Sequence, residues 1–174
     1  MSFEDKDNRL DSWNTKKKII DKRININYKK DGNVKFRIRP WSIWWFEVGE
    51  NIGSETGCHF NKLNLTTQRP CIVISTNNFN YATYNKKVIV MPLTSVKKDK
   101  EVKHFQYKLR AEKYKEFTDK NNKLKYVGLA KDSLVVCNDI KTIDTKRLIE
   151  PIYKELDSCD IRNIKKFMAK YLGV

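Results

Sequence analysis

The side chains best suited to chemistry lie at three points of this 174-residue chain. Gly53-Ser54-Glu55 ends a glycine-rich loop, Arg69 directly precedes an apolar run, and Thr94 and Ser95 directly follow another. A carboxylate, a guanidinium and a hydroxyl suit a metal-free attack on a phosphodiester. Such an attack needs groups that move protons and a fixed cation that offsets charge on the phosphoryl oxygens. In the structural alternative, Arg69 pairs with Glu55 and Thr94 caps its strand, and the residues considered alone favour that alternative.

Other catalytic chemistries have little support in the sequence. It contains no P-loop, GxSxG, HExxH or dinucleotide-binding motif, and no DxD or ExE cluster for a two-metal site. Cys58 and His59 are adjacent, which makes them poor partners for one zinc ion. We therefore expect no metal and no cofactor. The cysteines are dispersed, form no CxxC pair and are expected to be free thiols: Cys58, Cys71, Cys137 and Cys159.

Charge is the strongest signal in the composition. Thirty-six Lys and Arg face 21 Asp and Glu, which gives a net charge of +15. Such an excess attracts nucleic acid, an acidic protein or an anionic membrane, although a lysine-rich proteome produces it without any function. No apolar run approaches the ~20 residues that span a bilayer, and the MSFEDKDN start is no secretory signal. We expect a cytoplasmic protein that does not bind membranes.

Short strands with a helix at each end are the predicted elements. Helical spacing predicts a helix within residues 1–22, and alternation around an Asp-Gly turn predicts a hairpin over 24–39. Apolar or alternating runs predict strands over 42–48, 71–75, 88–93, 105–109 and 133–137. We also expect a loop from 49 to 68, turns over 76–86, a short helix over 111–118 and a helical turn ended by Pro151.

The final segment gives the clearest helix. An apolar stripe includes Ile161, Ile164 and Met168, Asp157 or Ser158 can cap the start, and Gly173 can cap the end. Together the elements predict a β-rich α+β fold, in which a small, strongly bent sheet or barrel is closed by this helix.

Several segments, taken in order, resemble the MazF/PemK toxins of bacterial type II toxin–antitoxin systems. They are SIWWFEVGENIGSE, RPCIVIS, VIVMPLTS, DSLVVCNDIKTIDTKRL and the amphipathic C-terminal helix. The resemblance covers roughly residues 40–174. It implies a toxin domain over 39–174 with a small SH3-like, CcdB/MazF-like β-barrel, preceded by a basic N-terminal extension over 1–38. It also implies a homodimer.

The same resemblance implies a metal-independent, sequence-specific endoribonuclease, or mRNA interferase, that acts on single-stranded RNA. The RNA 2′-hydroxyl attacks the adjacent phosphate, which leaves 2′,3′-cyclic phosphate and 5′-hydroxyl ends. The family's catalytic positions fall on Glu55, Arg69 and Thr94. Arg69 would combine acid–base work with phosphate stabilisation, Thr94 would help to hold the phosphate, and Glu55 would orient Arg69 or the attacking hydroxyl.

The resemblance also places RNA-binding positions at Gly53, Ser54, Ser95, Asp139 and Lys141, and it implies an acidic protein antitoxin as partner. This chain departs from the family in a longer 56–68 loop and in Asp139-Ile140-Lys141, where relatives often have Gln-Ile-Arg.

Two alternatives keep the barrel without this reaction. One is a non-catalytic module that binds RNA or a partner, and the other is a toxin that poisons gyrase. A binding module needs no Glu, Arg and Thr set, and a gyrase poison would depend on its C-terminal helix. The presence of all three residues favours the ribonuclease.

Overall fold

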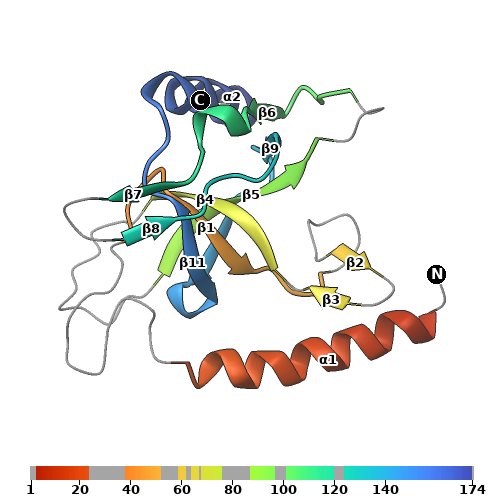
Figure 1. Ribbon diagram of the computed structural model, residues 1–174. Helices are drawn as coiled ribbons and strands as arrows, with labels where there is room; N and C mark the ends of the chain where they lie inside the picture. The colour runs from red at the N-terminus through yellow and green to blue at the C-terminus, as the bar shows by residue number, and fades with distance from the viewer. Residues whose placement is uncertain are drawn as a thin grey trace.

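A curved sheet lies between two helices in the computed structural model of the protein (Figure 1). The structure describes residues 3–23, 38–51, 59–61, 64–66, 68–75, 87–96, 101–119 and 124–173. The hairpin predicted over 24–39 falls almost wholly outside these residues, as do the turns over 76–86. Helix α1 spans Phe3–Asp21 and α2 spans Ser158–Leu172, and the two helices lie at opposite ends of the sheet.

Six strands and one side strand make the main sheet, in the order β11-β1-β4-β5-β9-β6, with β10 also paired to β5. Their bounds are β1 Ile43–Glu47, β4 Gln68–Ser75, β5 Lys87–Ser95, β6 Gln106–Leu109, β9 Ser133–Val136, β10 Lys141–Asp144 and β11 Leu148–Tyr153. Every pairing in this sheet is antiparallel.

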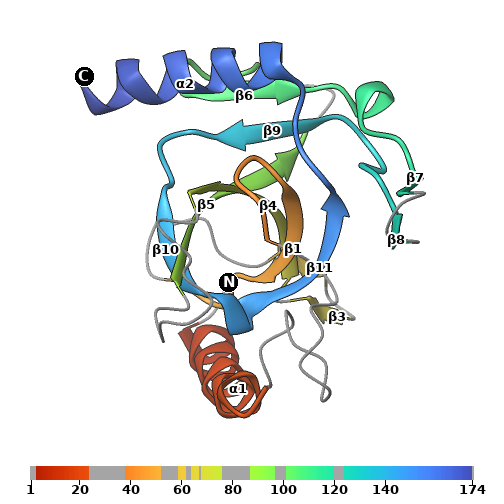
Figure 2. The ribbon, with the colours of Figure 1, turned by 90° about the vertical axis from the view of Figure 1, so that its left-hand side faces the viewer.

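Strand β5 bends the sheet, because its two halves have different partners. Its first half pairs with β10 over 87–90, and its last three residues pair with β9 over 93–95. The strands therefore curl around a core (Figure 2). Among the described strands no pairing joins β6 to β11, so the sheet does not close. The predicted β-rich α+β fold, a strongly bent sheet with a C-terminal helix, is confirmed, and the predicted barrel is an open sheet.

Apolar side chains fill both sides of the central strands. One cluster, beneath α2, includes Ile43, Ile72 and Ile164, and the other, inside the curl, includes Trp44 and Phe46. Successive residues of a strand point to opposite faces, so a strand buried on both faces has a continuous apolar sequence. This explains the IWWFE run of β1.

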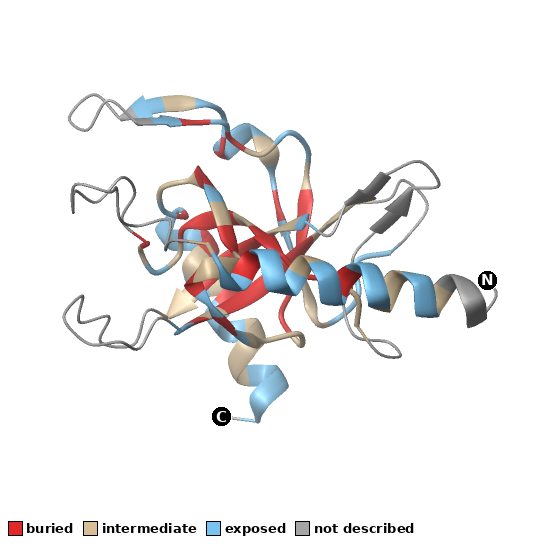
Figure 3. Cartoon of the chain, turned by 90° about the horizontal axis from the view of Figure 1, so that it is seen from below, coloured by how far each residue is buried: buried red, intermediate tan, exposed pale blue. Residues whose placement is uncertain are grey.

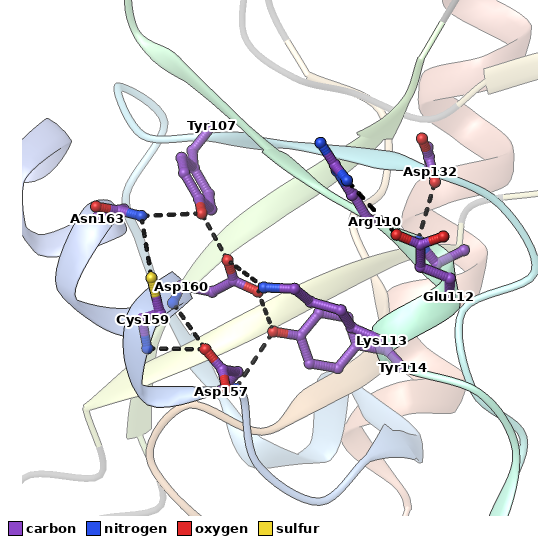
Figure 4. Close-up of polar contacts among 11 residues, drawn as sticks. Tyr107, Arg110, Glu112, Lys113, Tyr114, Asp132, Asp157, Cys159, Asp160 and Asn163 are labelled. Atoms are coloured by element: carbon purple, nitrogen blue, oxygen red, sulfur yellow. Dashed lines mark hydrogen bonds and ion pairs between the residues drawn. The ribbon is translucent and has the colours of Figure 1, made fainter.

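A buried carboxylate fixes α2 on the sheet (Figure 4). Asp160, in the first turn of the helix, accepts hydrogen bonds from the hydroxyls of Tyr107 at 2.6 Å and Tyr114 at 2.5 Å. Lys113 forms an ion pair with the same carboxylate at 3.2 Å. Burial raises the pKa of Asp160, but these three donors outweigh it and leave the pKa below its ordinary value. Asp157 caps the helix start as predicted, and Gly173 caps its end with a φ of 73°.

Three predicted details are wrong, and all concern short elements. The expected helix over 111–118 is one 3-10 turn, Ala111–Lys113, followed by strand β7, Phe117–Asp119. The expected loop up to residue 68 contains a small hairpin of β2, His59–Asn61, and β3, Asn64–Thr66. Pro151 lies inside β11 and ends no helical turn. It is tolerated there because β11 is an edge strand whose pairing with β1 shifts register on both sides of Trp44.

Candidate active site

A pocket of about 460 Å³ opens at one edge of the sheet. It is lined by side chains from the start of β4, the end of β5, strand β1 and the 127–131 segment: Trp45, Gln68, Arg69, Pro70, Leu93, Thr94, Ser95, Val127, Gly128, Leu129, Ala130, Lys131, Ser133 and Ile152. The segment after β8, Leu124–Tyr126, therefore supplies one complete wall.

Antiparallel pairing explains why Arg69 and Thr94 share this pocket. Strands β4 and β5 pair Cys71 with Pro92, so the first residues of β4 and the last of β5 lie at the same edge. Continuing that register by two residues sets Arg69 opposite Thr94. Arg69 and Thr94 are half-buried, as is Ser95. All three lie within their strands, whereas the sequence predicted one just before a strand and two just after.

The remaining predicted site residues lie elsewhere. Gly53, Ser54 and Glu55 fall outside the described residues, so the structure does not place the carboxylate relative to Arg69. Asp139 and Lys141 form an ion pair of 3.3 Å at the start of β10 and do not line this pocket. The Oδ2 of Asp139 and the Oδ1 of neighbouring Asn138 are buried without a hydrogen-bond partner among the described residues.

The sequence did not single out Trp45, Gln68 or Lys131, which also line the pocket. Trp45 is half-buried, while its neighbours Trp44 and Phe46 are fully buried. The alternation of a strand could have pointed to this difference, since Trp45 faces away from those two neighbours.

Backbone hydrogen bonds hold the 127–131 wall in place. The N–H of Gly128 donates to the carbonyl of Ile152 at 3.0 Å, and that of Leu129 donates to Tyr114 at 2.8 Å. Gly128 has a φ of 73°, and a side chain there would collide with the backbone of residues 114–116. The wall therefore needs glycine at this position.

A fixed negative charge follows the wall at Asp132. Its carboxylate accepts from the N–H of Ala111 at 3.0 Å and pairs with Lys108 at 2.9 Å. These contacts lower the pKa of Asp132, first through the backbone donor and then through the lysine. Lys131, the residue before Asp132, lines the pocket.

Among the described residues, no group of three or more His, Cys, Asp or Glu side chains could hold a metal ion. Within the same residues, no helix is long and apolar enough to cross a membrane.

Comparison with known proteins decides the family. The model of the PemK-like, MazF-like toxin of type II toxin–antitoxin systems matches residues 39–172. The chain belongs to this toxin family. The resemblance predicted from the sequence is therefore confirmed. Helix α1 of this MazF-like toxin lies outside the matched residues. No curated protein matches the chain.

One solved structure supports the fold, and two others are similar with lower TM-scores. MazF from Deinococcus radiodurans is 18% identical, covers 80% of this chain and 99% of its own, and superposes with a TM-score of 0.54. MazE-MazF from the same organism is 16% identical, with 80% and 98% covered and a TM-score of 0.48. An endoribonuclease in complex with its cognate antitoxin, from a mycobacterial species, is 14% identical, with 79% and 97% covered and a TM-score of 0.46.

Proposed function

We propose that this MazF-like toxin is a metal-independent endoribonuclease that cleaves single-stranded RNA at specific sequences. The observation that carries the proposal is the meeting of Arg69, at the start of β4, and Thr94, at the end of β5, in one pocket of a toxin-family fold. A guanidinium and a hydroxyl on rigid strand ends can hold a phosphate in a fixed orientation.

In the proposed reaction the RNA 2′-oxygen forms a bond to phosphorus while the bond from phosphorus to the 5′-oxygen breaks. The proton of the 2′-hydroxyl leaves, and the departing 5′-oxygen gains one, so the products end in a 2′,3′-cyclic phosphate and a 5′-hydroxyl. Arg69 offsets the charge that grows on the phosphoryl oxygens and takes part in the proton transfers. Thr94 holds the phosphate, and Glu55 orients Arg69 or the attacking hydroxyl.

RNA bases would bind on both sides of the phosphate. The half-exposed ring of Trp45 offers a stacking surface for an unpaired base, and Lys131 offers a backbone cation. Gly53, Ser54 and Ser95 would contribute further contacts. We assign sequence choice to Asp139 and Lys141, because this ion pair at the start of β10 carries both an acceptor and a donor suited to the edge of a base.

We expect the toxin to act as a cytoplasmic homodimer with RNA across its interface, and to be silenced by an acidic protein antitoxin. A disordered acidic segment that orders on binding can place carboxylates where RNA phosphates would sit. If antitoxin and single-stranded RNA bind at the same time and neither lowers the affinity of the other, the two do not share a binding surface.

The experiment is incubation of the purified chain with long single-stranded RNA in excess EDTA, followed by mapping of the ends. We expect cleavage at a short recurring sequence, and fragments that a polynucleotide kinase labels without phosphatase treatment. A requirement for added divalent metal, or 5′-phosphate ends, would contradict the mechanism. Intact RNA under all conditions would favour a non-catalytic module or a gyrase poison.

Substitution of one arginine in the pocket and one on the surface tests whether the pocket is the active site. Arg69→Ala should lower the cleavage rate roughly 10²- to 10³-fold, as expected for the loss of one donor that stabilises transition-state charge. Arg69→Lys should recover little, because an ammonium lacks the planar fork. Arg110→Ala removes the same side chain from the surface, where Arg110 is 68% exposed beside Glu112, and should leave the rate unchanged.

A further inference from the structure

Helix α1 lies across the sheet with most of its outer face exposed (Figure 3). Four cations from α1 and the two residues after it reach the sheet side: Lys6, Arg9, Lys16 and Arg23. They meet two buried carboxylates, Glu47 at the end of β1 and Glu50 shortly after it. The contact between helix and sheet is therefore electrostatic and directional.

Glu47 is the centre of the first contact. Its carboxylate is fully buried, with 0% of the side chain exposed, and pairs with Lys16 at 3.1 Å and Arg23 at 3.2 Å. A buried carboxylate without a cation is unfavourable, so these two partners hold the helix in one position. Arg147 braces the same turn by donating to the carbonyls of Glu47 and Val48, both at 2.7 Å.

The second contact lies at Glu50, shortly after Glu47 in the chain. Glu50, whose side chain is 6% exposed, pairs with Lys6 at 2.9 Å and Arg9 at 3.4 Å, and Lys6 also donates to the carbonyl of Asn51. Between the two contacts, the ring of Trp13 packs directly on Gly49, where any side chain would collide with it. Side chains from the start, the middle and the later part of α1 thus all contact residues 47–51.

The contact at Glu47 continues into the candidate active site. The Nε2 of Gln68 donates to the Oε1 of Glu47 at 3.4 Å, as expected from the pairing of these two residues between β1 and β4. Gln68 lines the pocket and directly precedes Arg69. A chain of polar contacts therefore runs from the cations of α1 through Glu47 to the pocket wall that carries Arg69.

We propose that α1 is a positioning element for the active site: Lys16 and Arg23 orient Glu47, which in turn orients Gln68 and the start of β4. Lys16, Arg23 and Glu47 are positioning residues and touch no RNA. The inference rests on the proposed ribonuclease function. It assigns to the segment outside the family match a role in setting the geometry around Arg69.

The test combines hydrogen exchange with single-turnover and steady-state cleavage. In Lys16→Ala/Arg23→Ala, we expect amide exchange in a peptide spanning residues 68–71 to rise about tenfold relative to the wild type. We expect kcat to fall roughly ten- to a hundredfold with KM changed less than twofold, because misplacement of a catalytic group affects the transition state. Lys16→Arg/Arg23→Lys should keep near wild-type values of both.

Two controls separate positioning from charge and from stability. Lys18→Ala/Lys22→Ala also removes two positive charges, but from exposed positions in α1 and directly after it. Ile164→Ala truncates a fully buried side chain of α2 and lowers stability comparably. Both controls should leave kcat and the exchange at 68–71 unchanged.

Unchanged exchange at 68–71 in Lys16→Ala/Arg23→Ala would overturn the proposal, as would a raised exchange with unchanged kcat. Equal losses of kcat in Ile164→Ala would also overturn it, because the effect would then follow stability alone. If the wild type cleaves no RNA, the ribonuclease function fails by itself, and the exchange measurement still decides whether α1 orients the pocket wall.

Discussion

Removal of the two cations that meet Glu47 should destabilise the protein more than removal of the carboxylate itself. The reason is unequal burial: the Glu47 side chain is 0% exposed, whereas those of Lys16 and Arg23 are 30% and 34% exposed. In Glu47→Gln both cations become hydrated, and the loss of charge-assisted hydrogen bonds lowers the stability by about 1.5–3 kcal/mol. In Lys16→Ala/Arg23→Ala the buried carboxylate loses both cations, and the expected loss is about 3–5 kcal/mol.

Guanidinium chloride unfolding at pH 7 and fixed protein concentration, followed by tryptophan fluorescence, measures both losses. The triple variant Lys16→Ala/Arg23→Ala/Glu47→Gln is the decisive sample, because it removes the buried negative charge together with these two cations. It should be more stable than the double variant by about 2 kcal/mol, a difference of roughly 4–8 °C in melting temperature for a chain of this size. If Glu47→Gln alone destabilises as much as the double variant, the burial argument is wrong.

Three further outcomes follow from the structure. Asp160→Asn should lower stability by about 2–3 kcal/mol at pH 7. The folded-state pKa of Asp160 is depressed, so its contribution to stability is present above about pH 4 and disappears as the pH falls through the folded-state pKa. Urea unfolding at about pH 2 should therefore show a smaller stability difference between the wild type and Asp160→Asn. An unchanged difference would exclude this linkage. Burial raises the pKa of Cys137 to about 11 and raises that of Cys71 further, so iodoacetamide at pH 8 should label exposed Cys159 at least tenfold faster than either, as peptide mass spectrometry would reveal. Gly128→Ala should shift the pocket wall and lower the melting temperature, whereas Ala130→Gly, at an exposed position of the same segment, should not.

The sequence predicted the elements whose signals are local. Strands β1, β4, β5 and β9 have continuous apolar runs, and α2 has both an apolar stripe and a capping residue. Strands β2, β3, β7 and β8 have three residues each, too few for a periodicity to appear. Strand β11 was missed because its Pro151 normally interrupts pairing, and only the edge position and the irregular register explain it.

The site was predictable to the extent that strand register could be inferred. The apolar runs placed Arg69 and Thr94 beside two core strands, and the resemblance to the toxin family made them candidates. The antiparallel pairing that brings the start of β4 and the end of β5 together is known only from the structure. The 127–131 wall could not be predicted, since it has no motif and is fixed by the carbonyls of Tyr114 and Ile152. The link from Gln68 through Glu47 to α1 depends on cations that the sequence analysis counted only as basic charge.

The net charge of +15 overstates what helix α1 can offer to RNA. Four cations of α1 and the residues after it pair with the buried carboxylates of Glu47 and Glu50. These two carboxylates offset part of the positive charge. Over the rest of residues 6–23 the exposed charges balance, with three lysines at 17, 18 and 22 against three aspartates at 7, 11 and 21, and Asp21 itself pairs with Lys146. A polyanion gains little from such a surface, because like and opposite charges alternate within one Debye length. The first helix is thus better suited to bracing the sheet than to extending an RNA groove.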